Sequence, residues 1–99
     1  MKQVYDIKTS KQYERDVKLA VRRGLDIEQL LDVVRLLRAG ELLPAKCHNH
    51  FLHGDYKGYW ECHINPDWLL LYEKDTGIRI ISLYRTGTHS DIFGKGKKK

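Results

Sequence analysis

Residues 67–85, DWLLLYEKDTGIRIISLYR, predict a β-hairpin, and this hairpin decides the fold class. Its two halves, 67–73 and 78–85, are rich in Trp, Tyr, Ile and Leu, which are residue types that favour strands. The Asp-Thr-Gly sequence at 75–77 lies between them and is typical of a tight turn. The aromatic segment 57–63 predicts one more strand, so the C-terminal half of the chain is expected to form a small sheet.

The N-terminal half has a helical pattern. Residues 3–8 alternate as a short strand, and Thr9 then has the side chain and position of a helix N-cap. The apolar spacing that follows predicts a first helix that ends at Gly24. Asp26 predicts the start of a second helix, which Gly40 ends.

The predicted order of elements is therefore β-α-α-β-β-β. This order indicates an α+β fold in which two N-terminal helices pack on one face of a small antiparallel sheet. A chain of 99 residues is long enough for one core, so we expect a single domain over residues 1–94. Residues 95–99, KGKKK, form a lysine-rich tail beyond it.

The positive charge of the chain lies mostly in that tail. Lys and Arg number 18 and Asp and Glu 13, which gives +5, and four of the lysines belong to the tail. Residues 1–94 thus carry 14 minus 13, or +1. A lysine run attracts phosphate groups, and it is equally common as a solubilising terminus. The apolar runs are too short to span a bilayer and no secretion signal begins the chain, so we expect a cytoplasmic protein without a membrane partner.

Histidines are concentrated in one part of the sequence, since all five lie between residues 48 and 89. His63 ends one predicted strand, Asp67 begins the next and Arg85 ends the last. Hairpin neighbours run in opposite directions, so the end of one strand and the start of the next lie at the same edge of the sheet. Adjacent strands there are only about 4.8 Å apart. We expect these residues to converge there with His89, and His50 in the preceding loop is a further candidate.

Two or three imidazoles, a carboxylate and a guanidinium suit the cleavage of RNA by its own 2′-hydroxyl. Imidazole takes or gives a proton near neutral pH, and guanidinium matches the charge and shape of phosphate. Taken singly, each of these residues is more often an ordinary surface residue than a catalyst. The zinc-compatible residues lack the spacing of a structural zinc site; they are Cys47, His48, His50, Cys62 and His63. We therefore expect reduced thiols, no metal and no cofactor.

Two motifs resemble a known family. Residues 63–68 form the pattern H-x-x-P-D-W and residues 85–93 the pattern R-x-G-x-H-x-x-x-F. Together they resemble the YafQ group of toxins, in the RelE/ParE superfamily of bacterial type II toxin–antitoxin systems. The resemblance implies a microbial RNase-like fold and a ribosome-dependent endoribonuclease. Such a toxin cuts mRNA in the ribosomal A site without a metal and leaves a 2′,3′-cyclic phosphate.

The resemblance also implies roles for individual residues. The general acid–base set would be His50, His63, Asp67 and His89, with Arg85 stabilising the charge of the phosphate. The residues implied in substrate binding are Trp68, Phe93 and Lys57. The implied partners are a DinJ-like antitoxin, the 70S ribosome with its mRNA, and operator DNA that is bound only through the toxin–antitoxin complex.

A non-catalytic function is the competing hypothesis. ParE-type members of the superfamily share the scaffold and act on DNA gyrase without an RNA-cutting set of residues. Two positions also depart from the family pattern, because Trp60 stands where many relatives have arginine and Phe51 where they often have proline. Three histidines, Asp67 and Arg85 at one predicted edge favour the nuclease.

Overall fold

The predicted hairpin forms the centre of the sheet. In the computed structural model, which describes residues 4–94, the hairpin consists of β4 (Trp68–Asp75) and β5 (Ile80–Gly87). The turn is closed by the Asp75 carboxylate, whose Oδ1 accepts hydrogen bonds from the backbone N–H groups of Gly77 and Ile78. An aspartate that bonds the backbone two and three residues on fixes a tight turn. The lysine-rich tail lies outside the described residues.

Three further strands complete a five-stranded sheet, with the order β1-β5-β4-β3-β2. They are β1 (Asp6–Thr9), β2 (His50–Phe51) and β3 (Trp60–Asn65). The pairs β2–β3, β3–β4 and β4–β5 are antiparallel, whereas β1 runs parallel to β5. The α+β class is confirmed, but the prediction of a purely antiparallel sheet is wrong for this one pair.

The parallel pairing follows from where the first helix must lie. The hairpin sets the direction of β5, and α1 (Lys11–Arg22) contacts the C-terminal part of that strand through an ion pair between Asp16 and Arg85. Because α1 begins directly after β1, β1 has to deliver the chain toward the same end of β5. The two strands therefore run in the same direction.

Side-chain caps mark the helix starts. The N-cap of α1 is Ser10, whose Oγ accepts a hydrogen bond from the N–H of Tyr13 at 2.8 Å. Thr9, which we expected to cap the helix, is still paired with Leu83 in the sheet. The second helix, α2 (Ile27–Arg38), starts at the predicted cap Asp26.

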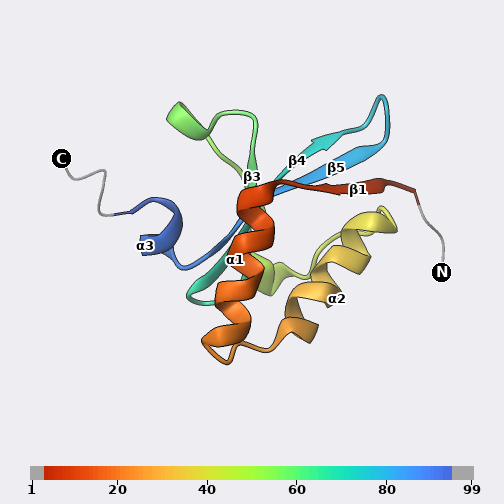
Figure 1. The fold of residues 1–99 in the computed structure, drawn as a ribbon. Helices are drawn as coiled ribbons and strands as arrows, with labels where there is room; N and C mark the ends of the chain where they lie inside the picture. The colour runs from red at the N-terminus through yellow and green to blue at the C-terminus, as the bar shows by residue number, and fades with distance from the viewer. Residues whose placement is uncertain (1–3, 95–99) are drawn as a thin grey trace.

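The sheet has a different cover on each face. The helices α1 and α2 pack on one face, where the larger core includes Cys62, Trp68, Leu70 and Tyr72. The other face carries a smaller cluster, in which Leu69 and Leu71 of β4 contact Ile92 of the short helix α3 (His89–Ile92). Figure 1 shows α3 and the start of β1 on opposite sides of the molecule.

Two 3₁₀ turns, η1 (Ala45–Cys47) and η2 (Gly54–Tyr56), flank β2. Both cysteines are free and buried, as predicted for reduced thiols. Among residues 4–94, no helix is long and apolar enough to cross a membrane.

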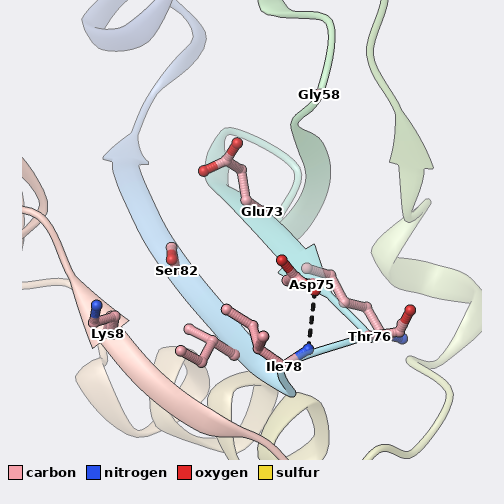
Figure 2. A pocket seen from close by; sticks show the side chains of 9 residues that line it. Lys8, Gly58, Glu73, Asp75, Thr76, Ile78 and Ser82 are labelled. Atoms are coloured by element: carbon pink, nitrogen blue, oxygen red, sulfur yellow. Dashed lines mark hydrogen bonds between the residues drawn. The ribbon is translucent and has the colours of Figure 1, made fainter.

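A shallow hollow of about 440 Å³ lies over the turn of the hairpin (Figure 2). Polar side chains from three adjacent strands border it, with Lys8 on β1, Ser82 on β5 and Glu73 on β4. The residues that line it do not include the histidines, Asp67 or Arg85. This hollow is therefore separate from the predicted site.

Candidate active site

A buried glutamate is the centre of the site. Glu61 is the second residue of β3, a strand in which alternate side chains face opposite sides of the sheet. Its pairing with Leu71 of β4 places it on the same face as α3, and its side chain is only 8% exposed. A charged carboxylate at this depth needs hydrogen-bonding or charged partners, which the neighbouring histidines provide.

Three imidazoles surround the Glu61 carboxylate. Nε2 of His50 lies 3.3 Å from Oε1, and Nε2 of His63 lies 3.4 Å from Oε2. Nε2 of His89 is 4.0 Å from the same Oε2. Strand pairing explains the first two contacts, because His50 is paired directly with Glu61 and His63 follows it by two residues on the same face. All three rings thus present the same nitrogen to one carboxylate.

The Nδ1 atoms of His50 and His89 have partners of their own. Nδ1 of His50 is 2.7 Å from the carbonyl oxygen of His48, which accepts a hydrogen bond only from an N–H. That bond places a ring proton on Nδ1 and leaves Nε2 facing the Glu61 carboxylate. Nδ1 of His89 is 3.5 Å from Oδ1 of Asp67. The structure therefore brings together four of the predicted residues: His50, His63, Asp67 and His89.

The short helix α3, which begins with His89, is held in place by a capping box and by an ion pair with α1. Thr88 and Asp91 form a capping box, in which the Thr88 hydroxyl accepts from the N–H of Asp91 and the Asp91 carboxylate accepts from the N–H of Thr88. Arg23, at the C-terminal end of α1, donates two hydrogen bonds to the same carboxylate, at 2.7 and 3.2 Å. These contacts attach α3 to α1 and so fix the position of His89, the first residue of α3.

We predict that Arg23→Ala loosens α3 without unfolding the protein. The pair is partly exposed, so its loss costs little global stability, and the amides of α3 are expected to exchange with solvent about threefold to tenfold faster. Hydrogen exchange measures this. The matched control is Arg35→Ala, which removes an exposed pair with Asp32 and should leave α3 unchanged. Unaltered exchange in α3 after Arg23→Ala would contradict the assigned role.

The same pair has a defined pH range. The hydrogen bonds from Arg23, with those from Thr88, lower the pKa of Asp91 from 3.8 to about 2. Because the pKa in the folded state is the lower one, the pair stabilises the fold above about pH 4. That stabilisation is lost as the pH falls toward 2, so α3 stays anchored throughout the neutral range.

Arg85 is paired with Asp16 of α1. Its Nε and Nη2 donate to the two carboxylate oxygens of Asp16, at 2.9 and 3.2 Å, and its side chain is 22% exposed. Asp16 also accepts from the backbone N–H of Thr86. These bonds raise the pKa of Arg85 further above its ordinary value. In the described part of the chain, the recorded contacts of Arg85 are with α1 and α3 and none is with an imidazole of the site.

The predicted substrate-binding residues are placed differently from one another. Trp68 is 1% exposed in the helix-side core, where its indole N–H donates to the hydroxyl of Thr86, so it offers no face to a base. Phe93 is half-buried, and its ring contacts Tyr56 and His89 at centroid distances of 5.0 and 6.4 Å. Lys57 is exposed next to η2. Burial leaves the Trp68 ring without an exposed face for a base, so its part in substrate binding stays a prediction that its position does not favour.

The centre of the site also has the donor set of a metal site. One ligand atom each from Glu61, His63 and His89 lies within 4.8 Å of the others. Imidazole nitrogen and carboxylate oxygen are ligands that zinc and copper accept. His63 was among the zinc-compatible residues of the sequence, whereas Glu61 and His89 were not. The imidazole nitrogens of His63 and His89 could therefore either bind a metal ion or transfer protons in catalysis.

Comparison with known proteins settles the family. Residues 5–94 match the family model described as the bacterial toxin of a type II toxin–antitoxin system, YafQ. The chain belongs to the YafQ family. The match covers nearly all of the described residues, including α1, α2, α3 and the whole sheet, so the resemblance of the two motifs is confirmed over the full fold.

Three relatives illustrate the family. The mRNA interferase toxin YafQ of Escherichia coli strain K12 is 42% identical over 90 residues, which cover 90% of this chain and 96% of the relative. The YafQ chain in the E. coli DinJ–YafQ toxin–antitoxin complex is 40% identical, with a TM-score of 0.84 over 92% of this chain and 99% of that one. A metal-bound toxin from Helicobacter pylori is 37% identical, with a TM-score of 0.84 over 90% and 99% of the two chains.

Sequence analysis missed Glu61 in this YafQ-family site. Glu61 lies inside the predicted aromatic strand 57–63, whereas the predicted site residues lie mostly at strand ends. A signal was present, because Glu61 stands two residues before His63 in a strand whose neighbours are apolar or aromatic. An acidic residue at such a position is either exposed or paired, and an imidazole two residues away on the same face supplies the pairing.

Proposed function

We propose that this YafQ-family toxin is an mRNA interferase, an endoribonuclease that cuts mRNA in the ribosomal A site and so stops translation. The observation that carries the proposal is the convergence of three imidazole Nε2 atoms on the buried carboxylate of Glu61. The curated E. coli relative at 42% identity, which is an mRNA interferase, supports the same activity.

The proposed reaction is a metal-free transfer within the RNA backbone. One imidazole accepts the proton of the 2′-hydroxyl, whose oxygen attacks the adjacent phosphorus and forms a 2′,3′-cyclic phosphate. A second imidazole donates a proton to the 5′-oxygen as its bond to phosphorus breaks. Glu61 holds both rings in place and compensates the positive charge that one of them carries. Asp67 orients His89 through Nδ1 in the same way.

The ribosome supplies what this small site lacks. Residues 1–94 carry a net charge of only +1, so they attract mRNA weakly by themselves. In our proposal the ribosome holds the substrate strand, and the lysine-rich tail assists by contacting phosphate. A DinJ-like antitoxin inhibits the toxin, as the E. coli DinJ–YafQ complex suggests, and the pair binds operator DNA. The toxin acts in the cytoplasm as a single domain.

Primer extension on an mRNA translated by purified ribosomes tests this proposal. We expect the wild type to cut at codons in the A site and to leave RNA uncut when ribosomes are omitted. His63→Ala should slow cutting by about 100-fold or more, because it removes a group that transfers protons. The matched control is His53→Ala, which removes an exposed imidazole outside the cluster and should cut within about twofold of the wild type.

Two further arms separate the alternatives. A chelator selective for transition metals, which leaves ribosomal Mg²⁺ in place, should not change the rate if the reaction is metal-free. A folded wild type that leaves translated mRNA intact would refute the nuclease and favour a toxin that only binds a protein target. Cutting by His63→Ala at the wild-type rate would refute the proposed acid–base set.

A further inference from the structure

A second hollow adjoins the acid–base cluster. It has a volume of about 500 Å³, within the range of ligand-binding sites, and it lies between the start of α2, the η1 turn and the β3–β4 connection. Gln29, Lys46, His48 and Asn65 line it together with His63. His63 is thus shared by the hollow and the cluster, with Glu61 and His89 on the cluster side.

The lining groups suit a nucleobase. Gln29 and Asn65 each bring a carboxamide, a group that pairs with the donor and acceptor atoms on the edge of a base. Oδ1 of Asn65 accepts from the N–H of Asp67, which leaves its Nδ2 as the donor for a ligand. The His48 ring stands edge-to-face to His63 with centroids 5.6 Å apart, and imidazole rings stack on unpaired bases. No Asp or Glu is among the residues that line this hollow.

The geometry of the reaction places a base of the mRNA next to this hollow. Attack by a 2′-hydroxyl requires the scissile phosphate to lie against His63 and its neighbours in the cluster. The nucleotides on either side then extend away from the phosphate in two directions. One direction leads past His89 and Phe93, whose rings are 6.4 Å apart, and the other leads past His63 into the hollow beside His48.

We propose that the hollow formed by Gln29, Lys46, His48 and Asn65 binds the mRNA base next to the scissile phosphate and sets the codon preference. This inference rests on the proposed nuclease function. The carboxamides of Gln29 and Asn65 read the edge of the base, the His48 ring stacks on its face, and Lys46 meets a phosphate. The residues that read the base are separate from those that move protons.

Codon discrimination is the measurement that tests the subsite. In the purified translation system, cutting is measured as kcat/KM on matched mRNAs whose A-site codons differ by one base. We expect Asn65→Ala and Gln29→Ala to reduce the ratio between the best and the worst codon by about tenfold. On the best codon, Gln29→Ala should act mainly on KM and change kcat by less than about threefold, because Gln29 lies on α2 and outside the acid–base cluster. Thr76→Ala is the control, because it alters the hollow over the hairpin turn (Figure 2) and should change neither value.

A second readout keeps the subsite separate from the nuclease. A trinucleotide with 2′-deoxyribose at the scissile position is titrated into the wild type while the side-chain amide signals of Gln29 and Asn65 are followed by NMR. We expect both signals to shift. Unchanged discrimination in both variants would overturn the subsite and leave the nuclease standing. A wild type that does not cut would overturn the proposed function, and an absence of amide shifts would then overturn nucleotide binding as well.

Discussion

Replacing Glu61 by glutamine is expected to slow mRNA cleavage by about 10²- to 10³-fold. Glutamine has nearly the same volume, so the packing against Leu71 is kept while the charge is removed. The three Nε2 atoms, at 3.3, 3.4 and 4.0 Å, would then face a neutral amide that no longer compensates an imidazolium. Because the lost interaction acts on the reacting groups, kcat should fall while KM changes by less than about threefold.

The control for this prediction is Glu73→Gln. Glu73 lies two residues along β4 from Leu71, but it is exposed and borders the hollow over the hairpin turn, whose lining includes no histidine. Its replacement should leave kcat within about twofold. Thermal unfolding shows whether each variant keeps its fold. A folded Glu61→Gln protein with kcat within threefold of the wild type would show that the carboxylate is not needed and would move the catalytic role to Asp67.

Local patterns predicted the elements of this fold well. The composition of residues 67–85 was sufficient for the hairpin, and Asp26 marked the start of α2 because an N-cap acts within its own turn. The strand that pairs with β1 could not be predicted in this way. The parallel pairing of β1 with β5 joins segments more than 70 residues apart, and it depends on how α1 packs rather than on the strand sequences. Periodicity contains no information on that choice.

The same distinction explains the site. The histidines and Asp67 were found because their residue types are rare and their strand ends had to meet at one edge. Trp68 and Arg85 have equally suggestive types, yet burial and long-range pairing decide their roles. Trp68 donates to Thr86 inside the core, and Arg85 is bonded to a residue 69 positions earlier in the chain. A single sequence does not show which partner a side chain will reach across the fold.

Removing the carboxylate of Asp16 is expected to lower the free energy of unfolding by about 3 kcal/mol. Asp16 is buried and accepts hydrogen bonds from Arg85, from Gln12 and from the backbone N–H of Thr86. Asp16→Ala leaves that N–H without its acceptor in the core and deprives Arg85 of its counter-charge. For a domain of this size the melting temperature should fall by roughly 12–24 °C, which thermal unfolding monitors directly.

Asp32→Ala is the matched control, because it removes an equally short contact to an arginine from a helix surface. Asp32 lies 2.6 Å from Arg35, but both side chains are about half or more exposed, so the loss should be below about 1 kcal/mol. The variant Arg85→Ala completes a double-mutant cycle with Asp16→Ala. If the two residues act mainly on each other, the double variant loses little more stability than either single variant. Additive losses, or a stable Asp16→Ala protein, would instead mean that Arg85 is held by other contacts and is free to serve the phosphate.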